Sequence, residues 1–258
     1  MANTLLKVDN VKKVFGGLMA IVDLSFEVKP GQIKSVIGPN GAGKTTLFNM
    51  ITGVHPVTGG EIFFQDRRID RLKPYEIASL GISRTFQTVE LFGNMTVLEN
   101  VMVGCHPRTR SGILAAGLRW PKMKKEEAWI GEESLKKLDL GGLKEKAHQP
   151  STSLPLGEQK ILEVLRALAT QPKLVLLDEP AAGLNESETR QMSKLIYSIR
   201  DSGITILLVE HDMSLVMKVS DEIVVINYGQ KIAEGTPEEI QNNPRVIEAY
   251  LGGDIDYA

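Results

Sequence analysis

The chain has 258 residues, which is enough to bury one sizeable core plus a subdomain but hardly two full independent domains. Its 30 lysines and arginines against 32 aspartates and glutamates give a net charge of −2, which excludes a global basic field that would recruit nucleic acid or anionic lipid. The single cysteine, Cys105, excludes an internal disulfide and favours a reducing compartment, and the lack of a signal pattern or of about 18 consecutive apolar residues predicts a protein that is neither secreted nor membrane-spanning.

The first part of the chain is predicted to form strands that lead into a glycine-rich loop. Apolar residues alternate with polar ones over 24–28, which is the period of a half-buried strand, and Pro30-Gly31 predicts a turn after it. A β-prone run at 33–37 precedes the loop Gly-Pro-Asn-Gly-Ala-Gly-Lys-Thr-Thr at 38–46. Apolar residues at helical spacing over 47–51 follow, so the predicted order is strand, loop and helix.

The loop fits the phosphate-binding pattern G-x-x-x-x-G-K-[ST] in the structural setting that this pattern requires. Glycines without a Cβ let the backbone turn and point successive N–H groups at a polyphosphate, and the helix N-terminus adds its positive dipole end. Lys44 is expected to reach the β- and γ-phosphates, and the Thr45 hydroxyl is expected to coordinate Mg²⁺. A glycine-rich turn with a chance lysine is the alternative, which the flanking strand and helix disfavour. The predicted phosphate-binding residues are Asn40, Gly41, Ala42, Gly43, Lys44, Thr45 and Thr46.

The middle of the chain changes from strand to helix signals. A further strand is expected over 61–65, and Pro74 suits the first turn of a short helix that ends at Gly81. From about residue 88 to residue 170 the pattern is helical, and Thr96 with Glu99 forms a capping box.

A basic stretch over 106–125 carries six cationic side chains and no acidic one. We expect a solvated connector there, and the alternative is a surface that meets an acidic or membrane-proximal partner. The cations are Arg108, Arg110, Arg119, Lys122, Lys124 and Lys125.

The last third alternates strand and helix, which is typical of a parallel sheet covered on its faces. Strands are expected over 174–177, 204–209 and 222–227. The helix between the first two has an apolar stripe that we assign to the core, consisting of Met192, Leu195, Ile196 and Ile199.

Two carboxylates, Asp178 and Glu179, follow the apolar strand at 174–177. Such a strand delivers an acid to the C-terminal edge of the sheet, where ligands of open α/β sheets bind. Asp178 is therefore predicted on the Mg²⁺ side, and Glu179 is predicted as the general base for the water that attacks the γ-phosphorus. Surface acids also follow strands in many proteins, but the loop upstream favours a functional pair.

Taken in order, the motifs of this chain resemble those of ABC-transporter ATPase subunits over nearly its whole length. The resemblance implies an α/β P-loop NTPase fold with a mainly parallel sheet, an N-terminal antiparallel β part and a helical subdomain. It places the nucleotide-binding core at 1–87 and 171–258 and the helical signature subdomain at 88–170. The motifs are the loop, Arg84-Thr85-Phe86-Gln87, the segment Leu154 to Gln159, Asp178-Glu179, Ala182-Gly183-Leu184-Asn185 and Glu210-His211-Asp212.

The resemblance also implies roles for individual side chains. Gln87 would bridge Mg²⁺ and the attacking water, and His211 would hydrogen-bond the γ-phosphate, although a surface histidine is the alternative for His211. Phe15 falls where the family stacks an aromatic ring on adenine, and a core role is nearly as good an interpretation. The predicted catalytic set is Glu179, His211, Gln87 and Lys44, and the predicted metal set is Thr45, Gln87 and Asp178.

Two departures from the family pattern affect the predicted contact between subunits. The usual Leu-Ser-Gly-Gly-Gln is Leu-Pro-Leu-Gly-Glu here, so Pro155 replaces a hydroxyl that reaches the ATP of a second subunit. Gly157 keeps its backbone N–H for that phosphate, so we expect a contact weakened by about 1–3 kcal/mol rather than lost. Asn185 stands where an aspartate is common, which softens a second contact between subunits.

Shorter sequence segments, such as Phe15-Gly16-Gly17-Leu18-Met19-Ala20, resemble those of the ATPase subunits of branched-chain amino acid importers. The resemblance implies ATP and Mg²⁺ as cofactors and a place on the cytoplasmic face of the cell membrane. The implied partners are a second ATPase subunit, either identical or a paralogue, transmembrane permease subunits and, indirectly, an extracytoplasmic solute-binding protein. The alternatives are an ATPase for lipids or another cargo, a soluble ABC protein of translation or DNA repair, and a regulatory subunit inactivated by Pro155.

Overall fold

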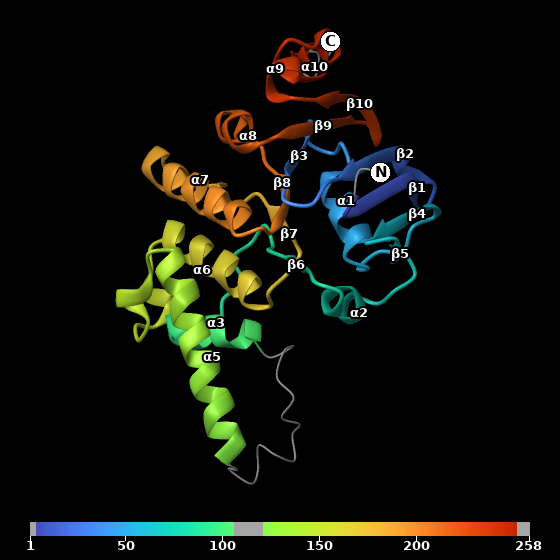
Figure 1. Ribbon diagram of the computed structural model, residues 1–258. Coiled ribbons are helices and arrows are strands. Elements are labelled where there is room, and N and C mark those ends of the chain that lie inside the picture. The colour runs from blue at the N-terminus through green and yellow to red at the C-terminus, as the bar shows by residue number, and fades with distance from the viewer. Residues whose placement is uncertain (1–3, 106–120, 252–258) are drawn as a thin grey trace.

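The computed structural model describes residues 4–105 and 121–251 (Figure 1). The strands are β1 (Leu6–Phe15), β2 (Leu18–Val28), β3 (Ile33–Ile37), β4 (Gly59–Phe64), β5 (Arg67–Arg68), β6 (Ile82–Arg84), β7 (Leu174–Asp178), β8 (Thr205–Val209), β9 (Glu222–Asn227) and β10 (Gln230–Gly235). The helices are α1 (Lys44–Ile51), α2 (Pro74–Ser79), α3 (Val97–Cys105), α5 (Pro121–Leu140), α6 (Leu156–Ala169), α7 (Glu186–Asp201), α8 (Met213–Val219), α9 (Pro237–Gln241) and α10 (Pro244–Leu251). Short 3₁₀ turns lie at Lys144–Lys146 and Ser151–Ser153.

The described strands form one sheet in the order β5-β4-β1-β2-β10-β9-β3-β8-β7-β6. Its parallel part runs from β9 to β6, and every residue of β3, β7 and β8 is buried, as expected for strands covered on both faces. The strands predicted at 33–37, 174–177, 204–209 and 222–227 are confirmed. The sequence did not predict β6 or β10.

The antiparallel part is built from the N-terminal strands. β1 pairs with β2 and β4, and β4 pairs with β5. β2 joins the rest of the sheet through one parallel pair between Gln230 and Asp23, and β10 runs antiparallel to β9. The expected α/β fold with an N-terminal antiparallel β part is therefore confirmed.

Alternate residues of β7 face two hydrophobic clusters on the two sides of the sheet. Val175 and Leu177 belong to the cluster that includes the inward faces of α6 and α7. Leu174 and Leu176 belong to the cluster that includes α1. Because side chains alternate between the two faces of a strand, the phosphate-loop helix α1 and the helix α6 pack on opposite faces of β7.

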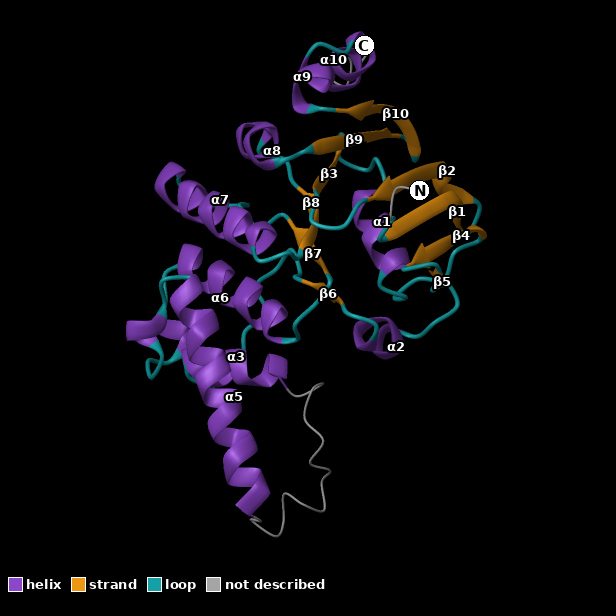
Figure 2. Cartoon of the chain, in the orientation of Figure 1, coloured by secondary structure: helices purple, strands orange, loops and turns teal. Residues whose placement is uncertain are grey.

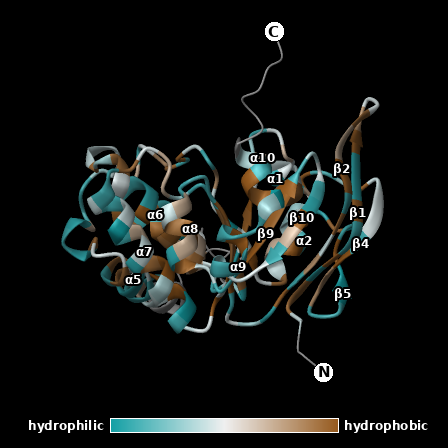
Figure 3. Cartoon of the chain, turned by 90° about the horizontal axis from the view of Figure 1, so that it is seen from above, coloured by the Kyte–Doolittle hydropathy of each residue, from teal (hydrophilic) through white to brown (hydrophobic). Residues whose placement is uncertain are grey.

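The helices α3, α5 and α6 gather away from the strands β1, β2 and β4 (Figure 2). Seen from above, α5, α6 and α7 lie on one side of the molecule and these strands lie on the other (Figure 3). The hydrophobic cluster of α6 continues into α7 and β7, so the boundaries of a helical subdomain at 88 and 170 stay a prediction.

The predicted capping box opens α3. The Thr96 N–H donates to Glu99 Oε2 at 2.7 Å, and the Glu99 N–H donates to Thr96 Oγ1 at 3.2 Å. Most of the basic stretch 106–125 lies outside the described residues, so its role stays a prediction. Within the described ranges, no helix has both the length and the apolar character needed to cross a bilayer.

Candidate active site

The glycine-rich loop connects the end of β3 to the start of α1. Gly38, Gly41 and Gly43 all have positive φ angles, of 155°, 78° and 105°. A Cβ at Gly38 would lie 2.0 Å from the carbonyl oxygen of Ile226, and one at Gly43 would lie 2.7 Å from that of Ala20. The two neighbouring backbones therefore require glycine at these positions.

Lys44 is buried inside the loop that precedes it. Its Nζ donates to the carbonyl oxygens of Gly38 at 2.7 Å and of Pro39 at 3.0 Å. Burial lowers the pKa of Lys44, and the nearby carboxylates of Glu179 and Asp178 oppose that shift. The ammonium group thus hydrogen-bonds to the backbone of its own loop, while Thr45 is exposed beside it at the start of α1.

Three predicted catalytic side chains from distant parts of the sequence meet at Glu179. Gln87 Nε2 donates to Glu179 Oε2 at 2.9 Å, and His211 Nε2 lies 3.0 Å from Glu179 Oε1. A carboxylate offers about four lone-pair positions, so each oxygen keeps room to accept from a water molecule. The arrangement can orient and deprotonate a water, and the roles of the three residues stay predictions.

The backbone at Glu179 is unusual, because its φ is +49°, a left-handed value that is uncommon outside glycine. The Glu179 N–H donates to the carbonyl oxygen of Val209 at 2.9 Å, which ties the turn to the end of β8. A non-glycine residue persists in this conformation only where its surroundings hold it, and such residues cluster at functional sites.

Arg84 is a residue whose role the sequence reasoning missed. Its side chain is 8% exposed, and its Nη2 donates to Asp178 Oδ2 at 2.7 Å while its Nη1 donates to Asn49 Oδ1 at 2.7 Å. The guanidinium lies 5.5 Å from the ring of Phe48 and 5.4 Å from the ring of Phe86. One cation therefore connects α1, the end of β7 and the segment that leads to Gln87.

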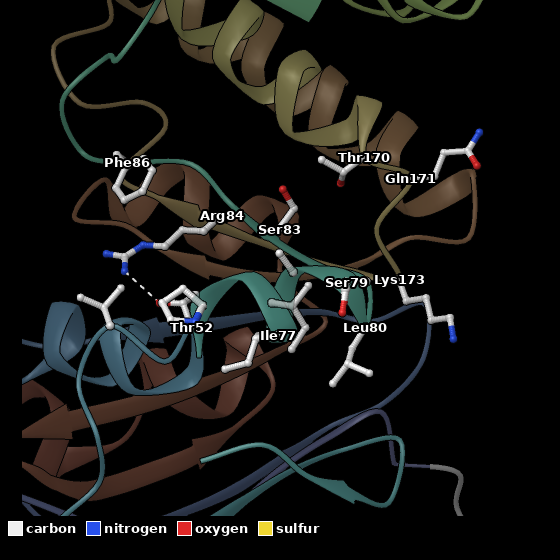
Figure 4. A pocket seen from close by; sticks show the side chains of 15 residues that line it. Thr52, Ile77, Ser79, Leu80, Ser83, Arg84, Phe86, Thr170, Gln171 and Lys173 are labelled. Carbon is white, nitrogen blue, oxygen red and sulfur yellow. Dashed lines mark hydrogen bonds between the residues drawn. The ribbon is translucent and has the colours of Figure 1, made fainter. Parts of the chain in front are cut away.

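Figure 4 shows Arg84 on the wall of a cavity, with its guanidinium directed toward Thr52 and Phe86 close by. The Arg84 bond holds Oδ2 of Asp178, and within the described part of the chain no hydrogen bond reaches Oδ1. One oxygen of this buried carboxylate is thus left for a cation. The described residues contain no cluster of three or more His, Cys, Asp or Glu that could hold a metal by itself.

A second missed residue, Glu210, connects the turn after β7 to the segment of His211. Glu210 is buried, its Oε1 accepts from the Ala181 N–H at 2.6 Å, and its Oε2 accepts from the His211 N–H at 2.9 Å. Burial raises the pKa of Glu210, and these backbone bonds oppose the shift. The sequence places Glu210 in the motif Glu210-His211-Asp212, but it does not predict that Glu210 joins the backbones of Ala181 and His211.

The segment Leu154 to Gln159 is less enclosed than the loop. Pro155 is the N-cap of α6 and provides no side-chain cap, and both Pro155 and Leu156 are exposed. Gly157 is buried against the side chain of Glu188. Asn185 is the N-cap of α7, where its Oδ1 accepts from the backbone N–H groups of Ser187 and Glu188.

Phe15 lies at the end of β1 with part of its ring exposed. Its ring centroid lies 5.3 Å from that of His55 in an edge-to-face contact, and Lys13 Nζ lies 4.6 Å from the Phe15 centroid. This exposure leaves room for the predicted stacking on adenine, which stays a prediction.

Comparison with known proteins supports the resemblance. Residues 21–182 match the family described as "ABC transporter", and residues 230–256 match the family described as "Branched-chain amino acid ATP-binding cassette transporter". The High-affinity branched-chain amino acid transport ATP-binding protein LivG of Escherichia coli (strain K12) is 45% identical over 98% of this chain and 99% of its own length. The corresponding BraF protein of Pseudomonas aeruginosa is 44% identical over the same shares.

Solved structures match the fold over the same extent. The ADP conformation of MJ1267, an ATP-binding cassette of an ABC transporter, superposes with a TM-score of 0.82 and 32% identity over 96% of this chain and 99% of that one. A nucleotide-free ATP-binding cassette from an ABC transporter superposes with a TM-score of 0.82 and 33% identity over 96% of this chain and 98% of that one.

Proposed function

The chain belongs to the ABC transporter family and is an ATPase, and we propose that it powers the import of branched-chain amino acids. The single observation that carries the hydrolytic part is the meeting of Gln87 and His211 at Glu179, beside the loop that encloses Lys44. The proposed cargo is supported by relatives whose names specify branched-chain amino acid transport and whose full length this chain covers.

We propose ATP and Mg²⁺ as the nucleotide and metal of this site. Asp178 and the Thr45 hydroxyl would hold the ion, because both offer oxygen and Mg²⁺ is usually bound by one or two carboxylates together with substrate phosphates. The absence of a larger acidic cluster in the described chain fits this mode of binding. The ion, when bound, neutralises charge on the phosphate oxygens.

The residues of the chain divide the hydrolytic work. Loop N–H groups and Lys44 hold the phosphates, and Glu179 takes a proton from the attacking water as that water bonds to the γ-phosphorus and the bond to ADP breaks. The Gln87 amide and the His211 ring keep the Glu179 carboxylate in place. His211 is also the residue that would bind the γ-phosphate.

We further propose that the chain works as a head-to-tail pair at the cytoplasmic face of the membrane. The Gly157 region of one subunit would contact the nucleotide held by the loop of the other, and the second subunit would be identical or a paralogue. Permease subunits would bind this pair and carry the substrate across the membrane. An extracytoplasmic solute-binding protein would act through that permease.

A Glu179→Gln variant tests the hydrolytic proposal. We expect phosphate release to fall by about 100-fold or more, the range for loss of a general base, while ATP affinity is kept. Glu186→Gln is the matched control, because the Glu186 side chain is 92% exposed on α7. Unchanged turnover in Glu179→Gln would count against the proposed role of Glu179.

The cargo requires a separate measurement. The chain should be co-purified with its permease subunits and reconstituted in lipid vesicles with the solute-binding protein. We expect leucine or isoleucine to stimulate ATP hydrolysis and to accumulate in the compartment that contains the ATPase. Stimulation by a lipid instead would favour the alternative cargo.

A further inference from the structure

We propose that Lys160 and Glu163 of α6 are positioning residues that tie this helix to the Glu179 turn and to the Gln87 segment. Movement of α6 would then be passed to both catalytic side chains at once. The inference rests on the proposed function, because there α6 begins at the contact with the nucleotide of the second subunit.

The two side chains make parallel contacts from one face of the helix. Lys160 is 6% exposed, and its Nζ donates to the carbonyl oxygen of Glu179 at 3.0 Å. Glu163 is 4% exposed, and its Oε1 accepts from the N–H of Phe86 at 3.1 Å. Residues three apart on a helix share a face, so one rigid element holds the residue before Gln87 and Glu179 itself.

Glu179 depends on such support more than an ordinary residue does. The N–H of this left-handed residue donates to Val209, and its carbonyl oxygen accepts from the Ala182 N–H at 3.2 Å and from Lys160 Nζ at 3.0 Å. Lys160 makes the one side-chain bond among these three, and it is the bond that joins Glu179 to α6. Its loss leaves the turn held by backbone bonds alone, so the side chain that meets Gln87 and His211 is held less firmly.

Fold stability does not explain the two charges. The helix positions around them, Ile161, Leu162, Val164 and Leu165, are apolar and buried in the core. Burial raises the pKa of Glu163 and lowers the pKa of Lys160, so the surroundings disfavour the charged form of each. Buried charges are costly to desolvate, and apolar residues at such positions are often as stable, so the two charges favour a functional explanation.

A second subunit would act on the first turn of α6. Gly157 lies one turn before Lys160 and about two turns before Glu163, at about 1.5 Å of rise per residue. Glu158 of this first turn pairs with the Lys146 ammonium at 2.6 Å, which fastens the turn to the 3₁₀ turn at Lys144–Lys146. A partner that draws the exposed end at Pro155 and Leu156 moves α6 as one body, and the two buried bonds carry the movement to the catalytic turn.

The test uses the full chain with Lys160→Met and Glu163→Met, each of which removes its hydrogen bond, with Lys160→Arg as the conservative variant and the exposed Lys194→Met on α7 as the control. ATP binding is measured at low protein concentration, and phosphate release is measured as a function of ATP concentration. We expect ATP affinity within about twofold of wild type, and a fall in kcat of about tenfold to 100-fold, the range for one lost charge-assisted hydrogen bond. The Hill coefficient should fall toward 1, and Lys160→Arg should recover part of the kcat.

A second readout does not depend on turnover. Amide hydrogen exchange of the segments 84–88 and 179–183 should be about tenfold faster or more in Lys160→Met and Glu163→Met, with no change in Lys194→Met. Unchanged exchange, or an unchanged kcat and Hill coefficient beside an active wild type, would overturn the inference. A wild type without turnover would contradict the proposed function instead, and the exchange result would still decide the role of the two residues.

Discussion

The glycine loop at 38–46 and the segment at 154–159 are both predicted to contact phosphate, but the chain builds them in different ways. The loop closes on itself, because Lys44 donates to its own backbone and Gly38 fits against the carbonyl of Ile226. The other segment exposes Pro155 and Leu156 and has no side-chain cap.

This difference separates a site that local sequence can specify from one that depends on distant partners. The loop lies between its strand and its helix in one continuous stretch from Ile33 to Ile51 that fits the P-loop pattern. The segment at 154–159 has neither a hydroxyl nor a closed pocket of its own, and its helix reaches the catalytic turn through Lys160. We therefore expect substitutions of the close-packed loop glycines to disturb the fold and substitutions in the segment at 154–159 to disturb activity.

A matched pair of glycine substitutions tests this expectation with the largest effect. In Gly38→Ala, the new Cβ meets a backbone oxygen at 2.0 Å, so we expect unfolding free energy to fall by about 4 kcal/mol or more. In Gly157→Ala, the new Cβ meets the flexible side chain of Glu188 at 2.8 Å. We therefore expect the unfolding free energy to fall by only about 1 kcal/mol, which is the scale of a disturbed helix cap. Urea unfolding measures both losses. Equal losses would show that the loop and the segment at 154–159 do not differ in how tightly they are packed.

Arg84→Met removes a cation that binds Asn49 of α1, the helix that follows the loop. Removing the guanidinium leaves the Asp178 carboxylate buried without its partner, which costs about 3–5 kcal/mol for a broken buried pair. The double variant Arg84→Met with Asp178→Asn should recover part of that loss, because the uncompensated charge is gone. Thermal or urea unfolding gives the values, and a single variant as stable as wild type would show that the pair contributes nothing.

Pro155→Ser has the smallest expected effect. A serine hydroxyl at the N-cap of α6 can accept from a first-turn N–H, so we expect stability to rise by about 1 kcal/mol. The same hydroxyl would restore the predicted contact with the nucleotide of a second subunit, so turnover should rise as well. Stability that rises without any change in turnover would mean that this position does not reach the second nucleotide.

The elements that sequence predicted well have strong local patterns. The strand, loop and helix around Lys44 are predicted by glycine spacing, and the strand at 174–177 is predicted by its continuous apolar run. β6 has only three residues and depends on pairing with β7, and β10 carries charged, partly exposed residues. Neither strand therefore shows a regular alternation of apolar and polar residues from which it could be predicted.

The missed site residues share another cause. Lys160 and Glu163 interrupt the apolar pattern of α6, and in a sequence such charges indicate a solvent-facing side. Arg84 and Glu210 stand beside recognised motif residues, but their partners come from other strands and turns. Only the packed structure brings each charge to its partner.

The most direct test of the whole account is nucleotide binding and phosphate release by Lys44→Ala, with the exposed Lys29→Ala as control. We expect Lys44→Ala to fold, to bind ATP more weakly and to lose turnover by about 100-fold or more, since an electrostatic group at the transferring phosphoryl is removed. Undiminished ATP affinity and turnover in Lys44→Ala would contradict it.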